Sequence, residues 1–445
     1  MGKQPTGVIK LDDKQPTGTE SPFKMTRKRF FAHLLGIGLM VGLENMGTDA
    51  AAAIGLKEDQ PSKHSPFLKV KGAQLVRGGK PFRNVGANIP DLFVRFLHGD
   101  DRGATQTLKN AASIGIEAVR CFGSTWLWDD FQIFEHDRSR WLKAYDRTMA
   151  AAGDNGVGLV PSLLFNIGMI PHYVRKYRGK PDEHVVDLCT PGTLSNQLAV
   201  EYVTTIVERY RDDARVLFWE VGNEYNLAAD LSAQWKQRPA NEIPTSNNIR
   251  AFLQQMAALI KQHDHNHAIT SGNADMRPYA WHIRQAMLKH QRDADPFNYP
   301  MDWRGDTFAE YKEMTRWFNP PPIDVISVHQ YPPKVPGDVG SWLKPEFDKN
   351  RDQMLPYSRQ VTDSMKCALY LGEFGGPVFQ DGKEVSSPFV LDVLRQTREG
   401  VVPVATIWSW EFYNGDPAQN PTTLSLTRTP RLAAIIRETN QSLSI

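Results

Sequence analysis

The chain has 445 residues, enough for a large core and for more than one domain, although single α/β barrels often exceed about 250 residues. Its 52 basic and 50 acidic side chains leave a formal net charge of +2, which argues against the basic field that selects nucleic acid or an anionic membrane. The three cysteines, Cys121, Cys189 and Cys367, exclude a disulfide-stapled scaffold, and no Cys/His spacing predicts a zinc site. No cofactor or metal is therefore expected.

The N-terminal 66 residues are predicted to lie outside the catalytic domain. Residues 1–24 are polar and contain KQPTG twice, which predicts a disordered extension. Residues 25–53 read as a signal peptide, with a basic cluster, an apolar stretch at 30–43 and a small-residue run. That stretch is shorter than the roughly 20 residues that span a bilayer. Residues 54–66 form a linker.

The signal-like segment predicts an exported protein, periplasmic or secreted. The string TRKRFF at residues 26–31 resembles a twin-arginine export signal, but Lys28 separates the two arginines and leaves the export route open. A buried N-terminal helix is the alternative interpretation of the apolar stretch.

Residues 67–445 predict one (β/α)8 barrel preceded by a β-hairpin. The hairpin is expected around Gly78 and Gly79, where it could cap the bottom of the barrel. Short runs rich in valine, isoleucine and aromatic residues then occur at residues 82–88, 118–122, 158–164, 216–221, 268–271, 325–328, 368–371 and 404–408. Helical patterns alternate with these runs, at residues 105–114, 141–152, 194–211, 248–263, 388–398 and 430–439.

This alternation predicts parallel βαβ units. A doubly wound open sheet is the rival architecture, but no nucleotide-binding glycine motif follows any of the runs, which favours the closed barrel. Residues 276–322, rich in Pro, Asp, Asn and aromatic residues, are expected to form an elaborated loop region on the substrate side.

Active sites of α/β barrels lie at the carboxyl ends of the strands, so polar and aromatic side chains there are informative. These are Arg120, Asn223, Glu224, His329, Tyr331, Glu373, Trp408 and Trp410. Glu224 follows the fourth run and Glu373 ends the seventh. Cleavage of a glycosidic bond needs one carboxylic acid to protonate the leaving oxygen and a second carboxylate at the anomeric carbon. Glu220, inside the fourth run, is expected to be a buried structural partner instead.

The separation of the two carboxylates would decide the stereochemistry of the reaction. About 5–5.5 Å is typical of retention and roughly 6.5–9.5 Å of inversion, and the sequence leaves this distance open.

Three strings together, FWEVGNEYN (218–226), ISVHQYPP (326–333) and YLGEFGG (370–376), resemble clan A of the glycoside hydrolases, above all family five. The resemblance covers the chain from about residue 67 onward. It implies a (β/α)8 barrel and a retaining mechanism, with Glu224 as acid/base and Glu373 as nucleophile.

The same resemblance implies roles for the flanking residues. Arg120 would keep the nucleophile ionised, Asn223 would bind the sugar 2-hydroxyl, and Tyr331, beside His329, would hydrogen-bond Glu373.

Aromatic residues are expected to bind the sugar ring. Trp408 or Trp410 would form its apolar floor, and the period of two of a strand places both on one face. Trp126 and Trp128 are further subsite candidates. The family usually has a histidine near the end of strand three, where this chain has Asn166, followed by His172 in the next loop.

The sequence thus predicts a retaining hydrolase of β-linked glucan or mannan, with an oligo- or polysaccharide as its partner. A transglycosylase with the same glutamates stays open, whereas a non-catalytic carbohydrate-binding barrel is disfavoured because both glutamates are present. A metal-dependent barrel hydrolase would need His and Asp ligands at several strand ends, and only His329 is well placed. The sugar, the linkage, endo or exo action and the oligomeric state stay open.

Overall fold

The computed structural model describes residues 66–125, 127–230, 244–290, 302, 304–332, 347–348, 353–412 and 422–443. The chain divides at Pro61, and all of these residues belong to the unit Ser62–Ile445. The predicted extension, the signal-like segment and all of the predicted linker except residue 66 lie outside the described residues, so these three assignments stay predictions.

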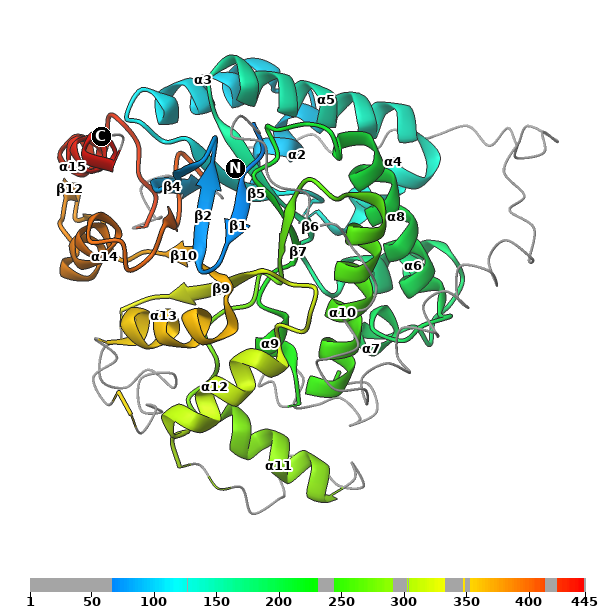
Figure 1. Cartoon of the computed structure of the whole chain (residues 1–445). Coiled ribbons are helices and arrows are strands. Elements are labelled where there is room, and N and C mark those ends of the chain that lie inside the picture. The colour runs from blue at the N-terminus through cyan, green and yellow to red at the C-terminus, as the bar shows by residue number, and fades with distance from the viewer. Residues whose placement is uncertain are drawn as a thin grey trace, which may run out of the picture. The chain divides into compact units, whose positions relative to one another are not determined.

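Within the described residues, eight parallel strands close into a barrel (Figure 1). In chain order they are β4 (Asn84–Asn88), β5 (Ala118–Phe122), β6 (Gly158–Leu164), β7 (Phe218–Gly222), β8 (Ala268–Thr270), β9 (Val325–Gln330), β10 (Ala368–Phe374) and β13 (Val404–Ile407). Neighbouring strands pair in chain order, and β13 pairs with β4 to close the ring. Each predicted run overlaps one of these strands, and β7, β9 and β10 extend beyond the carboxyl ends of their runs, so the (β/α)8 barrel is confirmed.

All residues of the eight strands are buried. Helices cover the outer face and side chains fill the inner face, which explains why the strands read as short, nearly continuous apolar runs. The polar side chains that interrupt these runs therefore lie inside the barrel or at its mouth.

The amino-terminal end of the barrel is closed by an antiparallel sheet of β1 (Lys69–Lys71), β2 (Gln74–Arg77) and β3 (Lys80–Pro81). The predicted turn joins β2 to β3 through Gly78 and Gly79, which have φ of 59° and 82°, values that favour glycine. Leu68, Leu75 and Phe82 pack in one apolar cluster with the first residues of several barrel strands. The hairpin is thus confirmed, with β1 as an additional strand.

The six predicted helices are all present, each within a few residues of the expected bounds. The helices are α2 (Leu92–Leu97), α3 (Asp101–Ala112), α4 (Phe131–His136), α5 (Arg138–Asp154), α6 (Met169–Tyr177), α7 (Val185–Leu188), α8 (Leu194–Tyr210), α9 (Tyr225–Ala228), α10 (Ser246–His263), α11 (Ala280–His290), α12 (Phe308–Trp317), α13 (Met354–Met365), α14 (Pro388–Arg398) and α15 (Pro430–Leu443). A 3-10 turn η1 (Trp128–Asp130) and the strand pair β11 (Phe379–Gln380) and β12 (Lys383–Glu384) complete the described elements.

The segment predicted as an elaborated loop, residues 276–322, contains two helices, α11 and α12. Helix α12 begins with a capping box, in which Thr307 accepts from the backbone N–H of Glu310 and the Glu310 carboxylate accepts from the N–H of Thr307. In Figure 1 α11 lies on the outer side of α12, away from the barrel strands. The excursion between β8 and β9 is therefore a packed helical pair rather than a simple loop.

Helix α15 docks on the first barrel strand through Asn440. Its side-chain oxygen accepts from the N–H of Val85 at 2.8 Å, and its amide donates to the carbonyl of Val85 at 3.0 Å. These bonds engage backbone groups of β4 that face away from the strand ladder. The last helix of the chain is in this way attached to the strand that closes the barrel.

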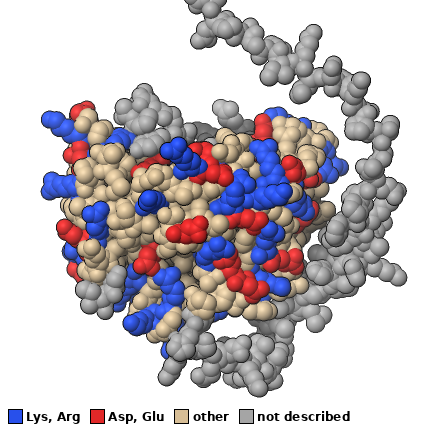
Figure 2. Space-filling view, turned by 90° about the horizontal axis from the view of Figure 1, so that it is seen from above, with Lys and Arg blue, Asp and Glu red and all other residues tan. Residues whose placement is uncertain are grey.

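Basic and acidic side chains are interspersed on the face shown in Figure 2. Among the helices that the structure describes, none is long and apolar enough to cross a membrane.

Candidate active site

Four strands bring polar side chains to the carboxyl-terminal mouth of the barrel. Arg120 comes from β5, His329 from β9 and Glu373 from β10, while Glu224 follows β7 by two residues. Direct contacts join all four. The structure thus gathers residues separated by up to 253 positions in the sequence into one cluster.

Arg120 is the centre of this cluster. Its guanidinium donates to Glu220 through Nε at 2.9 Å and Nη2 at 2.7 Å, to Glu373 Oε1 through Nη1 at 2.7 Å, and to Asn223 Oδ1 through Nη2 at 2.7 Å. Burial alone would lower the pKa of Arg120, but the charges of Glu220 and Glu373 outweigh burial and raise it. Arg120 therefore stays charged between two carboxylates, and Glu220 is the buried structural partner expected from the sequence.

Glu373 is held on both carboxylate oxygens. Oε1 accepts from Arg120, and Oε2 accepts from the Tyr331 hydroxyl at 2.7 Å. Burial, together with the charge of Glu373, raises the pKa of Tyr331 well above its ordinary value, so the phenol remains a donor at neutral pH. The two donors fix the direction of the Glu373 carboxylate.

Glu224 sits in a strained turn between β7 and α9. Its φ of 55° and ψ of 29° lie in the left-handed region, which costs a non-glycine residue about 1–2 kcal/mol. Its N–H donates to the carbonyl of Gly272 at 2.8 Å, beyond the end of β8. A side chain at 272 would place a Cβ only 1.8 Å from the carbonyl oxygen of Gly222, so glycine is needed there for the two backbones to approach. The turn directs Glu224 toward His329.

His329 hydrogen-bonds Glu224 through Nδ1, which lies 2.9 Å from Oε1. Burial raises the pKa of Glu224, but the hydrogen bond and charge of His329 and the charge of Arg120 outweigh burial, so the pKa lies below its ordinary value. In the substrate-free protein the contacts of Glu224 therefore favour its carboxylate form.

One oxygen of Glu224 and one of Glu373 lie within 4.8 Å of each other. This short separation agrees with the about 5–5.5 Å between carboxyl groups that is typical of retaining enzymes, in which the second carboxylate attacks the anomeric carbon directly. These two oxygens and His329 also have the composition of a metal site, but all three groups already hydrogen-bond Arg120, Tyr331 or one another.

The two tryptophans after β13 lie in different surroundings. Trp408 is half-buried, and its backbone and Cβ lie around Gly375 together with the ring of Tyr331. Trp410 is fully buried in the main hydrophobic core, so its indole offers no face to a ligand. The expectation that both share one strand face is wrong because β13 ends at Ile407, and the alternation of a strand does not continue beyond it.

Several other expected residues lie away from the cluster or outside the described residues. His172 lies in α6 rather than in a loop, and its Nε2 is 3.6 Å from Asp129. Trp126 and the side chain of Trp128 fall outside the described part of the chain.

Asn88, at the end of β4, is a site residue that the sequence analysis missed. Its Oδ1 accepts from Arg120 at 3.0 Å, and its amide donates to the carbonyl of Gly372 at 3.0 Å, one residue before Glu373. The signal was present, because Asn88 is the polar residue that ends the first apolar run.

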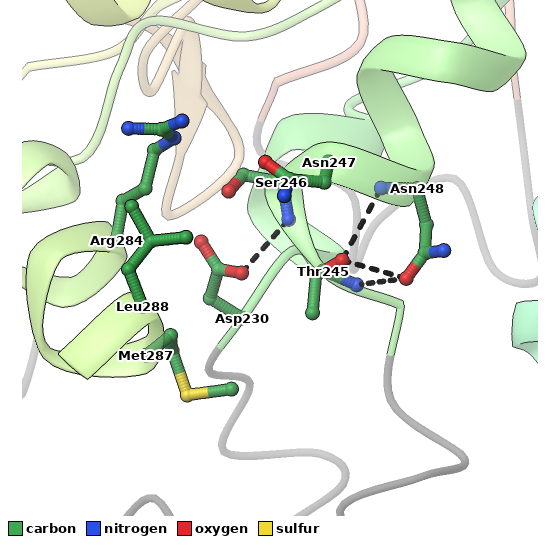
Figure 3. A pocket seen from close by; sticks show the side chains of 8 residues that line it. All are labelled: Asp230, Thr245, Ser246, Asn247, Asn248, Arg284, Met287 and Leu288. Carbon is green, nitrogen blue, oxygen red and sulfur yellow. Dashed lines mark hydrogen bonds between the residues drawn. The ribbon is translucent and has the colours of Figure 1, made fainter. Parts of the chain in front are cut away.

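A cavity of about 420 Å³ lies beside the N-terminus of α10, and none of its lining residues belongs to the carboxylate cluster. Figure 3 shows Asp230 and the start of α10 on one side and Arg284, Met287 and Leu288 of α11 on the other. Helix α11 thus forms one wall of this cavity.

The comparisons with known proteins agree with this geometry. The family model described as cellulase, glycosyl hydrolase family 5, matches residues 91–414. The mannan endo-1,4-beta-mannosidase 2 of Oryza sativa subsp. japonica is 24% identical over 294 residues, which cover 57% of this chain and 62% of the relative. The mannan endo-1,4-beta-mannosidase 7 of Arabidopsis thaliana is 22% identical over 369 residues, or 78% of this chain and 74% of the relative. The chain therefore spans less than two thirds of the first of these relatives.

Solved structures show the same fold. The endo-1,4-beta-mannanase of Rhizomucor miehei superposes with a TM-score of 0.57 at 16% identity, covering 85% of this chain and 99% of the other. The endo-beta-1,4-mannanase of Thermotoga petrophila gives 0.56 at 17% identity, with 82% and 77% covered. The family match takes in seven of the eight barrel strands and both glutamates, and this chain belongs to glycosyl hydrolase family 5, whose members hydrolyse β-linked glycans with retention of configuration.

Proposed function

We propose that this chain is an endo-acting β-1,4-mannanase in which Glu373 is the nucleophile and Glu224 the acid/base. The observation that carries the assignment of roles is the unequal environment of the two carboxylates. Glu373 accepts from Arg120 and Tyr331 on its two oxygens, while Glu224 hydrogen-bonds His329, a group able to share a proton. The choice of mannan is supported by the names of the relatives in rice and Arabidopsis.

In the first step, a Glu373 oxygen bonds to the anomeric carbon as the bond from that carbon to the leaving oxygen breaks. Glu224 gives that oxygen its proton. The pKa of Glu224 lies below its ordinary value in the free protein, so Glu224 must take up its proton as the bound sugar excludes water and raises that pKa. The product is a glycosyl ester on Glu373, with a neutral leaving group.

In the second step, Glu224 as carboxylate takes a proton from water while the water oxygen attacks the anomeric carbon. The ester bond to Glu373 breaks and its carboxylate returns to Arg120 and Tyr331. Two displacements on one carbon restore the original configuration. Asn223 accepts from Arg120 through Oδ1, and its amide N–H groups would donate to a sugar hydroxyl.

Trp408 supplies the apolar surface under the reacting sugar. It is the half-buried member of the tryptophan pair, and it lies beside Tyr331, which itself contacts Glu373. The C–H faces of a sugar ring pack well on such an indole.

The test measures reducing-sugar release from β-mannan and from β-glucan by wild type, Glu224→Gln and Glu373→Gln. Each substitution should lower kcat on mannan by about 10²- to 10⁴-fold or more, as for loss of a general acid or nucleophile. Glu438→Gln, an exposed carboxylate on α15, is the matched control and should leave activity unchanged. Equal or greater release from glucan would overturn the choice of mannan.

Azide rescue separates the two glutamates. The substrate is an aryl mannoside whose leaving group needs no proton. In Glu224→Ala, azide should restore turnover by attacking the covalent ester on Glu373, and the product should be the β-mannosyl azide. In Glu373→Gly, azide should restore turnover by attacking the substrate directly, and the product should be the α-mannosyl azide. The opposite pairing of variant and product would reverse the proposed roles. Transfer products that exceed hydrolysis products in the wild type would instead identify a transglycosylase.

We also propose that the protein is exported, on the support of the basic, apolar and small-residue order in residues 25–53. Fractionation of cells that express the full chain should place activity outside the cytoplasm. Replacement of Arg27, Lys28 and Arg29 by glutamine should leave the activity in the cytoplasm, and unchanged export of that variant would count against the signal.

A further inference from the structure

A second group of metal-binding side chains lies in the helical excursion between β8 and β9. His282 comes from α11, Asp306 lies one residue before Thr307, the N-cap of α12, and Glu310 lies in the first turn of α12. One ligand atom of each residue lies within 4.8 Å of the other two. Nε2 of His282 is 3.9 Å from Asp306 Oδ1 and 3.8 Å from Glu310 Oε2.

Two ligand atoms of this group are buried and, among the described residues, have no hydrogen-bond partner: His282 Nε2 and Asp306 Oδ1. His282 is 5% exposed and Asp306 is 1% exposed. Asp306 Oδ2 accepts from a backbone N–H, but Oδ1 has lost its hydration without gaining a donor or a cation.

His282 places its two ring nitrogens near different carboxylates. Nδ1 lies 3.4 Å from Asp302 Oδ2, while Nε2 is directed at Asp306 and Glu310. In metal sites a carboxylate beside one ring nitrogen orients the histidine and leaves the other nitrogen to bind the ion. With its hydrogen on Nδ1, His282 would present a lone pair at Nε2 to both carboxylates, a contact that a cation between them would make favourable.

A simple ion pair accounts less well for these distances. A protonated Nε2 would bond a carboxylate oxygen at about 2.7–2.9 Å, whereas both separations here are 3.8 Å or more. In a tetrahedral zinc site the ligand atoms lie about 2.0–2.2 Å from the ion and therefore roughly 3.4 Å from one another. The distances from His282 Nε2 to the two carboxylates would need to shorten by only a few tenths of an ångström to reach this geometry.

The two carboxylates are held in place by contacts that leave ligand capacity. Asp306 Oδ2 accepts from the N–H of Trp281 at 3.1 Å, so Oδ1 remains for a ligand. Glu310 Oε2, the oxygen 3.8 Å from His282 Nε2, accepts from the N–H and the hydroxyl of Thr307 at 2.7 and 2.8 Å, so Oε1 is the oxygen that these bonds leave for a cation. The guanidinium of Arg304 is exposed and pairs weakly, at 3.9 Å, with Asp302 rather than with the three ligands.

We propose that His282, Asp306 and Glu310 bind one divalent transition-metal cation of the zinc type, which fastens helix α11 to the start of α12. One imidazole and two carboxylates suit such a cation. The site does not depend on the proposed mechanism. Its structural effect reaches the cavity of Figure 3, because Arg284, Met287 and Leu288 on the same helix form one of the cavity walls.

The test uses the full chain, stripped with a chelator and then titrated with Zn²⁺. Metal content and the thermal midpoint Tm are measured together. One zinc ion per chain should bind, and Tm should rise by about 3–6 °C. Glycanase kcat, by contrast, should not require the metal. A folded wild-type chain that shows no stoichiometric zinc and no rise in Tm would overturn the proposal.

Two conservative variants identify the ligands. Asp306→Asn keeps an oxygen for the N–H of Trp281, and Glu310→Gln keeps the capping box of α12. Both variants should fold, and neither should show the rise of Tm on addition of zinc. A rise that persists in both variants but disappears in Glu373→Gln would place the ion at the barrel mouth instead, and would overturn the assignment.

The chelated protein distinguishes a metal site from an ion pair. Without metal, Asp306→Asn removes an uncompensated buried carboxylate, so its Tm should equal or exceed that of the chelated wild type. If Asp306→Asn instead lowers Tm equally with and without zinc, His282 forms an imidazolium ion pair and the metal site is excluded.

Discussion

At the scale of single residues, the hydrogen bond between His329 and Glu224 shifts the pKa of the proposed acid/base. His329 lowers the pKa of Glu224 through this bond and its charge, against the effect of burial. In His329→Asn both contributions weaken, so the pKa of Glu224 should rise. The alkaline limb of kcat/KM, which reports deprotonation of the acid in the free enzyme, should then move to higher pH.

The measurement is a pH profile of kcat/KM for wild type and His329→Asn on one soluble substrate. A fall in kcat without movement of the alkaline limb would mean that His329 only positions the substrate. Movement to lower pH would contradict the assigned direction of the pKa shift.

Substitutions of the two tryptophans after β13 should affect different properties, activity for Trp408 and stability for Trp410. Trp408→Ala should lower kcat/KM about tenfold or more, equivalent to roughly 1.4 kcal/mol, with little change in Tm, and Trp408→Phe should recover part of the loss. Trp410→Ala should cost about 3–5 kcal/mol of stability, because its indole is fully buried. Kinetics and denaturant unfolding on the same preparations check both outcomes, and equal effects of the two substitutions would contradict the division.

Much of this cluster was predictable from residue position, and some of it was not. Arg120, Glu224, His329 and Glu373 each end or follow an apolar run, and ends of parallel strands meet at one mouth. The bond from His329 to Glu224 was not predictable, because it depends on the left-handed turn at Glu224 and on the close approach at Gly272. Local sequence does not encode how deeply each strand end sits in the barrel.

At the scale of secondary-structure elements, helix α15 is hydrogen-bonded to β4 through the side chain of Asn440. Asn440→Ala leaves the N–H and the carbonyl of Val85 without their partner, which should cost about 2 kcal/mol or more of unfolding free energy. Gln441→Ala, at the exposed neighbouring position, is the control and should change stability by less than about 0.5 kcal/mol. Urea unfolding measures both, and equal stability of the two variants would show that α15 docks by apolar contacts alone.

The elements themselves were largely predictable where the apolar period is clear. Eight runs gave eight strands because a strand covered on both faces must be apolar almost throughout. Helices α11 and α12 were missed because Pro, Asp and aromatic residues obscure the helical period in residues 276–322. The Thr307–Glu310 capping box was the available signal for the start of α12.

At the scale of the whole molecule, the division at Pro61 predicts that residues 62–445 suffice for folding and catalysis. A chain that starts at Ser62 should keep the kcat of the full chain and a Tm within about 2 °C of it. Parallel thermal scans and mannan assays of both chains test this. A markedly lower Tm of the shorter chain would mean that residues 1–61 contribute to the stability of the barrel.

The single guanidinium between Glu220 and Glu373 also has a consequence for the electrostatics of the reaction. One positive and two negative charges leave the barrel centre with a formal charge of −1 in the resting protein. The transition state of glycoside cleavage carries positive charge on the sugar ring, so the sugar and the barrel centre together approach neutrality as the bond breaks. Formation of the ester on Glu373 then leaves Arg120 and Glu220 as a balanced pair. The barrel interior is thus least well compensated when the site is vacant and best compensated when a reacting sugar occupies it.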